Sequence, residues 1–402
     1  MTSSIFERVE MAPRDPILGL TEAFNADPRP QKVNLGVGVY CGEDGKVPLL
    51  ASVKAAEKAR VDSAPARSYL PIDGLATYDR AVQDLLFGAG AAVTGEGRAV
   101  TVQTLGGTGA LKVGADLLKR LHPGSSVHLS DPSWENHRGI FESAFLPVKT
   151  YPYYEAQSRG VQFAAMKAAL LSLSPGEVVL LHGCCHNPTG ADLNASQWRE
   201  VVAACSEREL VPFVDIAYQG FADGLEADAL SVRLFAEAGR PFLVSSSFSK
   251  SLSLYGERVG ALSIVAASKD EAARVLSQVK RLVRTNYSNP PTHGAAVVSA
   301  VLSSPELRRQ WESELAGMRD RVRAMREGLL ERLRARGVAQ DFSFIVKQRG
   351  LFSYTGLSAA QVERLKSEFG IYAVSSGRIC VAALSPRNID HVADALAAVL
   401  RS

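Results

Sequence analysis

The sequence predicts an α/β fold in which a mostly parallel sheet is covered by helices on both faces. Short apolar strands alternate with helix-like segments from about residue 48 to 300, as in proteins built on parallel sheets. The length of 402 residues exceeds one ordinary core and indicates two domains. We expect an N-terminal arm (1–12), a large domain (48–312), and a smaller α+β domain from both chain ends (13–47 and 313–402).

The composition narrows the possible functions. A hydrophobic content of 46% and a charged content of 22% are those of a soluble globular protein. The formal net charge of +3 indicates neither nucleic acid nor a membrane surface as a partner. No apolar run has the length of a membrane span, and the first ten residues lack a secretory signal core. The five cysteines have no repeated spacing, so we expect free thiols and a cytoplasmic protein.

The first part of the chain predicts few elements. Residues 17–24 are expected to form a short helix, and residues 32–40 alternate like a strand. The glycines of that strand, Gly36 and Gly38, permit another group to approach the backbone, although an edge strand with a bend fits equally well. Residues 48–64 read as a helix, and the loop after it carries an aromatic residue, Tyr69.

A glycine-rich turn follows the next strand. Residues 100–104 alternate as a strand, residues 106–109 are Gly-Gly-Thr-Gly, and a helix is expected over 110–118. A strand, a glycine turn and a helix start can bind an anion through free N–H groups and the helix dipole. The spacing is neither that of a Walker A loop nor that of a good dinucleotide fingerprint. A tight turn with no ligand is the alternative.

Two further strands end in polar residues. The strand over 126–130 leads to Trp134, whose flat face could contact a ring or simply cover the core. The strand over 178–181 continues into a turn at Asn187. His182, Cys184 and His186 would share one face of an extended strand, but no fourth ligand is near, so we predict no metal site.

Asp215 and Lys250 are the most informative residues of the next two strands. Asp215 ends the strand over 210–216, where a carboxylate needs a partner, and a protonated ring nitrogen or the cap of the next element would serve. Tyr218 could project to the same side. Lys250 follows the strand over 241–244, where partial burial lowers its pKa and enables it to attack a carbonyl.

Hydroxyl and guanidinium groups surround Lys250 in the sequence. Ser247 and Arg258 are the kind of donors that a phosphate needs. Together they indicate an aldehyde cofactor with a phosphate group, which is pyridoxal phosphate. A surface lysine in a serine-rich loop is the alternative. Ligands of such sheets bind where strands end, and five predicted features lie there: residues 106–108, Trp134, Asn187, Asp215 and Lys250.

The C-terminal third predicts a strand, two helices and a small mixed unit. A strand is expected over 261–266, a basic helix over 274–284, and a long helix from Leu307 to Gly337. The remaining residues form short strands and two helices, with Arg378 as the cation of the last apolar strand.

Seven segments, taken in order, resemble the pyridoxal-phosphate aminotransferases of the aspartate and aromatic amino-acid group, fold type I. The resemblance covers almost the whole chain and rests on residues 33–38, 106–111, 131–137, 186–190, 215–221, 247–250 and 376–378. It implies an enzyme that transfers an amino group through pyridoxal 5'-phosphate by a ping-pong mechanism.

The resemblance also implies roles for individual residues. Lys250 would hold the cofactor covalently and move the Cα proton, and Asp215, backed by His137, would pair with the ring nitrogen. Trp134 would stack on the ring, and Asn187 and Tyr218 would bond its hydroxyl oxygen. The phosphate would be held by Gly107, Thr108, Ser247 and Arg258, and by Tyr69 of a neighbouring subunit.

The same resemblance implies a substrate site and a homodimer. Arg378 would bind the substrate α-carboxylate, beside Trp134, Asn187 and the backbone at Gly36, and Arg284 from the neighbour would bind a side-chain carboxylate. Residues 69–71, 181–186, 253–258 and 378–382 look like the bacterial aromatic branch, whereas residues 35–38 and 286–289 look equally like the aspartate branch.

We therefore expect tyrosine and phenylalanine as amino donors to 2-oxoglutarate, with aspartate also accepted. The alternative is an enzyme whose main substrate is aspartate. An NAD-dependent dehydrogenase would leave Lys250 and Asp215 without a role, and a non-catalytic regulator would need a DNA-binding extension that the sequence lacks.

Overall fold

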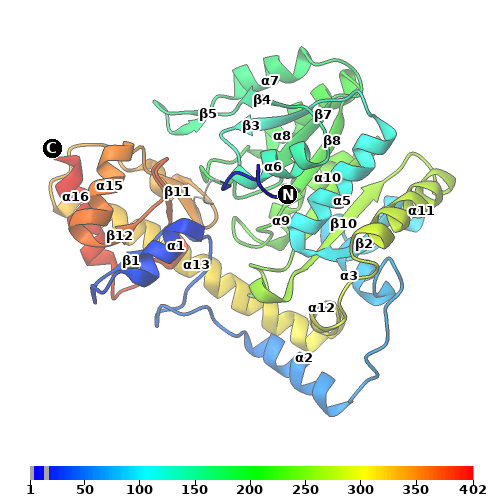
Figure 1. The fold of residues 1–402 in the computed structure, drawn as a ribbon, viewed down its shortest axis with the longest axis horizontal. Helices are drawn as coiled ribbons and strands as arrows, with labels where there is room; N and C mark the ends of the chain where they lie inside the picture. Colours follow the sequence, from blue (N-terminus) through cyan, green and yellow to red (C-terminus); the bar gives the residue numbers. More distant parts are fainter. Residues whose placement is uncertain (1–3, 13–17, 402) are drawn as a thin grey trace.

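A seven-stranded sheet forms the centre of the molecule (Figure 1). The computed structural model describes residues 4–12 and 18–401. The strand order is β2-β10-β9-β8-β7-β3-β4, and only β10 runs antiparallel to its neighbours. The predicted α/β class with a mostly parallel sheet is confirmed. The strands are β2 (Ala99–Leu105), β3 (Val127–Asp131), β4 (Val148–Pro152), β7 (Val178–His182), β8 (Val211–Ile216), β9 (Phe242–Ser247) and β10 (Val259–Val265).

Helices cover both faces of this sheet because successive strand residues point to opposite sides. Phe213 and Leu243 pack in one buried cluster, and the next residues, Val214 and Val244, pack in the other. The first cluster lies under α5 (Gly106–Leu121), α6 (Glu135–Ser143) and α11 (Lys269–Asn286). The second lies under α3 (Ala76–Phe87), α7 (Phe163–Leu171), α8 (Ala195–Glu207), α10 (Leu230–Glu237) and α12 (His293–Ser303).

The long helix α13 (Pro305–Ala335) connects the sheet to the C-terminal elements (Figure 1). Its apolar positions are buried at spacings of three and four residues, as predicted, including Trp311, Leu315 and Met318. The Trp311 indole donates to the Ser251 carbonyl at 2.7 Å, which ties the helix to the segment after β9. The predicted domain boundary at residue 312 falls within this unbroken helix, and the division into domains stays a prediction.

The two ends of the chain come together beside α13. Strand β1 (Val33–Asn34) pairs with β12 (Ile371–Tyr372), and β11 (Phe352–Tyr354) pairs with β13 (Arg378–Cys380). The remaining elements are α1 (Leu18–Ala26), α2 (Ala51–Asp62), α4 (Ala92–Gly95), β5 (Tyr154–Glu155), β6 (Gly160–Val161), α9 (Leu225–Asp228), η1 (Tyr255–Glu257), α14 (Phe344–Lys347), α15 (Ala359–Phe369), η2 (Val381–Ala383) and α16 (Ile389–Leu400).

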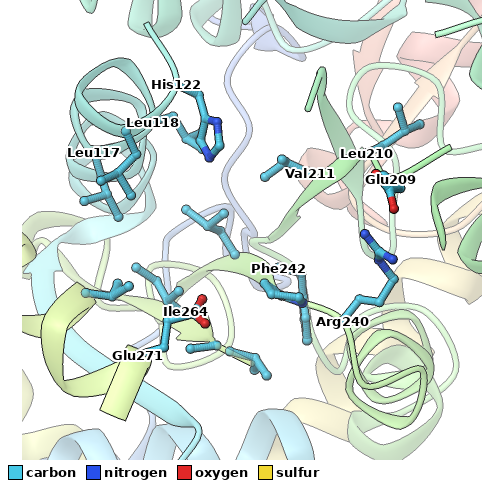
Figure 2. Close-up of a pocket in the computed structure, with 16 residues that line it drawn as sticks. Leu117, Leu118, His122, Glu209, Leu210, Val211, Arg240, Phe242, Ile264 and Glu271 are labelled. Atoms are coloured by element: carbon cyan, nitrogen blue, oxygen red, sulfur yellow. The ribbon is translucent and has the colours of Figure 1, made fainter. Parts of the chain in front are cut away.

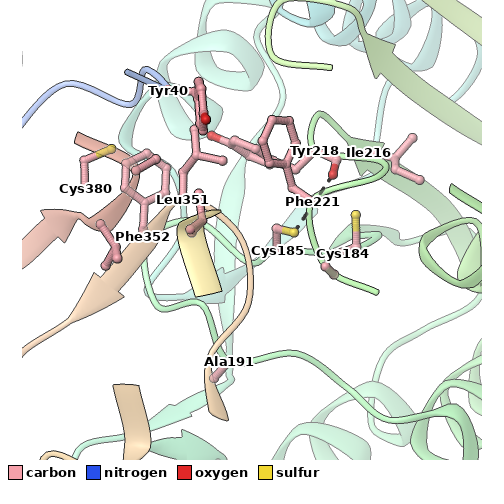
Figure 3. Close-up of a cluster of buried hydrophobic side chains, with 14 of the residues drawn as sticks. Tyr40, Cys184, Cys185, Ala191, Ile216, Tyr218, Phe221, Leu351, Phe352 and Cys380 are labelled. Carbon is pink, nitrogen blue, oxygen red and sulfur yellow. Dashed lines mark hydrogen bonds between the residues drawn. The ribbon is translucent and has the colours of Figure 1, made fainter. Parts of the chain in front are cut away.

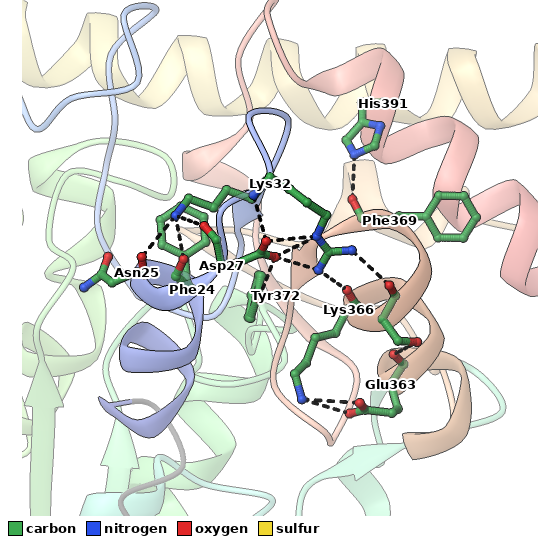
Figure 4. Close-up of polar contacts among 11 residues, drawn as sticks. Phe24, Asn25, Asp27, Lys32, Glu363, Lys366, Phe369, Tyr372 and His391 are labelled. Carbon is green, nitrogen blue, oxygen red and sulfur yellow. Dashed lines mark hydrogen bonds and ion pairs between the residues drawn. The ribbon is translucent and has the colours of Figure 1, made fainter.

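Polar contacts hold the N-terminal segment against α15 and β12 (Figure 4). The Tyr372 hydroxyl donates to Asp27 Oδ2 at 2.8 Å, and Lys32 Nζ donates to the Phe24 carbonyl at 2.7 Å. Arg29 donates to the same aspartate and to the Lys366 carbonyl at 2.8 Å. The hydrogen bonds from Arg29 lower the pKa of the Asp27 carboxyl far below its usual value.

Two elements predicted near the N-terminus differ from the structure or extend beyond the described residues. The strand predicted over residues 32–40 is wrong beyond Asn34, because the chain leaves β12 and turns toward β13, where Leu35 O accepts from Cys380 N at 2.7 Å. The helix predicted over 17–24 is α1, and its predicted first residue, Ile17, lies outside the described residues. The same is true of the first three residues of the predicted N-terminal arm.

Candidate active site

A cavity of about 460 Å³ lies where the central strands end. Strands β2, β7, β8 and β9 run in the same direction, so their last residues meet at one edge of the sheet. The cavity collects most of the residues that the sequence singled out. These lining residues are Gly107, Thr108, Trp134, Asn187, Asp215, Tyr218, Ser247, Lys250, Arg258 and Arg378.

Lys250 lies three residues beyond β9 and brings a primary amine into the cavity. Its Nζ stands 4.6 Å from the centroid of the Tyr218 ring. Burial lowers the pKa of the Lys250 amine to about 8, although the nearby Asp215 carboxylate acts in the opposite direction. About a tenth of this amine is therefore uncharged at pH 7, far more than for an ordinary lysine, and the uncharged form can attack a carbonyl carbon.

Asp215 is held by a chain of buried polar groups. His137 is fully buried, and its Nε2 lies 3.1 Å from Asp215 Oδ2. His137 Nδ1 lies 2.9 Å from Ser133 Oγ, which is 3.1 Å from His182 Nε2. Burial alone would raise the pKa of Asp215, but the hydrogen bond and electrostatic interaction with His137 hold it below the ordinary value. Asp215 thus remains a carboxylate that can keep a proton on a facing nitrogen.

An anion cradle forms where β2 runs into α5. Helix α5 begins at Gly106, within the predicted glycine turn, where the Gly106 N–H donates to the Arg258 carbonyl at 2.9 Å. No side chain caps the N–H groups that follow, so they can donate to a ligand. Gly106 adopts φ +68°, and a Cβ there would lie 2.6 Å from Arg258 Nη2, so only glycine fits. Arg258 itself has φ +52°, and its Nη1 donates to the Tyr255 carbonyl at 2.9 Å. Ser247, across from Gly107, completes the cradle.

Arg378 is buried and lines the same cavity. Its Nη1 donates to Asn187 Oδ1 at 3.2 Å and its Nη2 donates to the Gly36 carbonyl at 2.7 Å. The guanidinium carbon stands 4.4 Å from the centroid of the Phe352 ring. These contacts fix the plane of the guanidinium, and a planar, fixed guanidinium suits a carboxylate ligand.

Two predicted residues are not brought to this cavity. Tyr69 is 93% exposed in the loop between α2 and α3. Arg284 is exposed in the last turn of α11, where it donates to the Ser288 hydroxyl. Their role in the site of a neighbouring subunit stays a prediction.

The cavity also contains residues that the sequence did not single out. Phe352 comes from β11 in the C-terminal part, and it packs edge-on against Tyr218 with ring centroids 6.2 Å apart. Figure 3 shows this group of buried side chains, with Cys185 close to the Tyr218 carbonyl and Cys184 beside it. Phe352 has no local signal, because its place in the cavity depends on a contact with Tyr218, more than 130 residues earlier, in the loop after β8.

The histidines after β7 do not form the strand face considered from the sequence. Strand β7 ends at His182, the chain then turns, and the rings of His182 and His186 lie against each other at a tilt of 38°, with centroids 4.1 Å apart. Burial lowers the pKa of His182 to about 3, so this ring is neutral. Within residues 4–12 and 18–401, no group of three or more His, Cys, Asp or Glu side chains is placed to hold a metal ion.

A second cavity, of about 260 Å³, lies at the opposite edge of the sheet, where β8 and β9 begin (Figure 2). Leu117, Leu118 and Phe242 form part of its apolar wall, and Arg240 and Glu271 also line it. None of the predicted site residues lies there. In the described part of the chain, no helix is long and apolar enough to cross a membrane.

The sheet and its carboxyl-edge cavity define an α/β enzyme with a reactive amine, a buried carboxylate and an anion cradle. The chain belongs to the aminotransferase class I and II family, which matches residues 30–396. The aspartate aminotransferase of Pseudomonas aeruginosa is 62% identical over 397 residues, which cover 99% of this chain and 100% of that protein. The aromatic-amino-acid aminotransferase of Escherichia coli K12 is 52% identical, with 98% and 100% covered.

Solved structures agree with this membership. The crystal structure of the aromatic-amino-acid aminotransferase from Burkholderia pseudomallei, covalently bound to pyridoxal phosphate, has a TM-score of 0.97 and 65% sequence identity to this chain. The match covers 99% of this chain and 100% of that one. The fold predicted from the sequence is thus also the fold of a structural relative.

The cavity fits pyridoxal phosphate by the chemistry of its residues. An aldehyde requires an amine that is partly uncharged, and burial gives Lys250 that property. A pyridine nitrogen that stays protonated requires a buried carboxylate, and Asp215 is one. A phosphate requires N–H donors and a cation, which the start of α5 and Arg258 provide.

Proposed function

We propose that the protein is an aromatic-amino-acid aminotransferase that uses pyridoxal phosphate. It moves the amino group of tyrosine or phenylalanine to 2-oxoglutarate and also accepts aspartate. The observation that carries the proposal is that the Lys250 amine, Asp215 and the buried Arg378 line one cavity with an anion cradle. Membership of the aminotransferase family and relatives of both substrate branches support it.

Different residues of the cavity would bind the phosphate, the ring nitrogen, the ring face and the hydroxyl oxygen of the cofactor. The phosphate would be bound by the start of α5 at Gly107 and Thr108, by Ser247 and by Arg258. Asp215, supported by His137, would keep a proton on the ring nitrogen, while Trp134 would lie against the ring. Asn187 and Tyr218 would bond its hydroxyl oxygen. When bound, pyridoxal phosphate supplies an electron sink for the charge left at the substrate Cα.

Lys250 and Arg378 would act on the substrate itself. Arg378, fixed by Gly36 and Asn187, would bind the α-carboxylate and so place the Cα–H bond toward the lysine. The Lys250 amine would take the proton from the substrate Cα and would give it to the cofactor carbon. Because this amine lies 4.6 Å from the Tyr218 ring centroid, the phenol would limit its movement.

The proposal includes a homodimer in the cytoplasm. Tyr69 and Arg284 are exposed and would complete the site of the partner, which one chain alone leaves without them. The N-terminal segment exposes Ile5, Phe6, Val9 and Met11, an apolar surface that a second copy would cover. The five cysteines are free thiols, which fits a reducing compartment. Analytical ultracentrifugation tests the dimer, and a fully active monomer would contradict it.

A main activity on aspartate is the second candidate, and the aspartate aminotransferase of Pseudomonas aeruginosa, at 62% identity, favours it. The deciding experiment is a comparison of kcat/KM for tyrosine, phenylalanine and aspartate with 2-oxoglutarate as acceptor. Comparable values for all three substrates support the proposal. Full activity on aspartate with none on tyrosine or phenylalanine would replace it by the second candidate.

A further inference from the structure

Glu135 places a carboxylate beside the arginine proposed to bind the substrate. Its Oε2 lies 3.8 Å from Arg378 Nη1, a distance for an ion pair without a direct hydrogen bond. The Arg378 side chain is 1% exposed, whereas that of Glu135 is 39% exposed. Glu135 therefore brings a partly exposed carboxylate against a guanidinium that is otherwise buried.

The other polar contacts of Arg378 are with uncharged groups. Its two hydrogen bonds go to neutral oxygens, Asn187 Oδ1 and the Gly36 carbonyl, and its Nε has no partner. Among the described residues, Glu135 is the only acidic side chain within 4.0 Å of this guanidinium. The charge of Arg378 is thus balanced in part by a residue that a substrate carboxylate would have to replace.

The surroundings of Glu135 favour this contact. It is the first residue of α6 and directly follows Trp134, which lines the cavity. Arg138, one turn further along α6, is paired with Glu142 at 3.0 Å and is therefore engaged elsewhere. The positive end of the helix dipole explains why an acidic residue is tolerated at the start of α6. It does not explain why the carboxylate is placed against Arg378.

We propose that Glu135 is a specificity-determining residue that competes with the substrate α-carboxylate for Arg378 and disfavours substrates with a second carboxylate. A monocarboxylate such as phenylalanine has to displace one negative charge from Arg378. A dicarboxylate such as aspartate also brings a second negative charge past Glu135, so its binding is weakened further. The inference rests on the proposed function in one respect, the binding of a substrate carboxylate by Arg378.

The test compares the Glu135→Gln holoenzyme with the wild type. We measure kcat and KM for phenylalanine and aspartate, and the dissociation constant of 3-phenylpropionate, an unreactive monocarboxylate. Because Glu135 is partly exposed, we expect the dissociation constant and both KM values to fall by about two- to fivefold, with kcat nearly unchanged. The fall in KM should be larger for aspartate than for phenylalanine. Glu135→Asp keeps the charge and should stay closer to the wild type.

Glu200→Gln is the matched control. Glu200 lies on another helix, α8, and its side chain has a similar exposure of 45%. It is paired with Lys167 of α7 at 2.8 Å. Its replacement removes the same charge and should leave all of these constants unchanged. An unchanged or higher dissociation constant for Glu135→Gln would overturn the inference. So would weaker binding of amino acids with unchanged binding of 2-oxo acids, since Glu135 would then attract the substrate ammonium group. A wild type that binds no carboxylate at all would instead overturn the proposed function.

Discussion

Replacement of Arg378 by lysine tests the carboxylate site most sharply. The guanidinium donates from Nη1 to Asn187 and from Nη2 to the Gly36 carbonyl, and it lies against the Phe352 ring. Lysine keeps the positive charge but has a single nitrogen, so it cannot hold these two oxygens and present a planar pair of donors to a carboxylate. The expected result is a loss of substrate binding without a loss of net charge.

The size of the loss follows from the hydrogen bonds at stake. A hydrogen bond to a charged group contributes about 1.5–3 kcal/mol, so losing one bond to the substrate carboxylate should lower kcat/KM by about ten- to 150-fold. Phenylalanine and aspartate share the α-carboxylate, and both should be affected by the same factor. The assay is a steady-state measurement with each substrate. A loss confined to aspartate, or no loss with either substrate, would refute the role given to Arg378.

Arg326→Lys is a control for the effect of changing a buried arginine. Arg326 is 2% exposed, and its guanidinium donates to the carbonyls of Ile345, Gly350 and Phe352 and to the Ser353 hydroxyl. Its replacement should lower the melting temperature because buried carbonyls lose their donors. At temperatures where the protein is folded, kcat/KM should change much less than for Arg378→Lys.

Three further results are expected. Asp215→Asn removes the charge that would face a protonated ring nitrogen, and breaking such a buried pair costs about 3–5 kcal/mol, so kcat should fall roughly 100- to 5000-fold for every amino acid; normal turnover would contradict this. Arg284→Leu should reduce kcat/KM for aspartate by about 30- to 5000-fold, equivalent to about 2–5 kcal/mol, while kcat/KM for phenylalanine changes little; equal losses would mean a structural role. Burial lowers the pKa of Lys250 to about 8, so the cofactor-free protein should bind an aldehyde faster as pH rises through about 8 and then reach a plateau; a midpoint near the ordinary lysine value would contradict it.

The sequence predicted the central sheet and the residues at its edge for local reasons. Apolar strands are short and followed by polar residues, so Asp215 and Lys250 could be placed at strand ends from their neighbours alone. Parallel strands then bring these ends together, and the cavity contains them both. The glycine turn was also recognisable, although the helix begins inside it at Gly106 rather than after it.

Contacts between distant segments could not be predicted in the same way. The strand predicted over residues 32–40 stops at Asn34 because the chain pairs with β12 only over Val33–Asn34. Beyond that point Gly36 contacts Arg378, about 340 residues later. Phe352 and Glu135 lie near Arg378 only through tertiary packing, and neither has a distinctive local pattern. Tyr69 and Arg284 are exposed on one chain, so their role depends on a partner subunit.

The covalent attachment site of the cofactor is the most direct test of the proposed chemistry. The purified protein is reduced with borohydride and digested, and the peptides are examined by mass spectrometry, with Lys250→Ala treated in parallel. The expected result is a phosphopyridoxyl group on Lys250 and on no other lysine, and no such group in the variant. A modified lysine elsewhere, or an unmodified Lys250 in a protein that carries out transamination, would contradict the central claim.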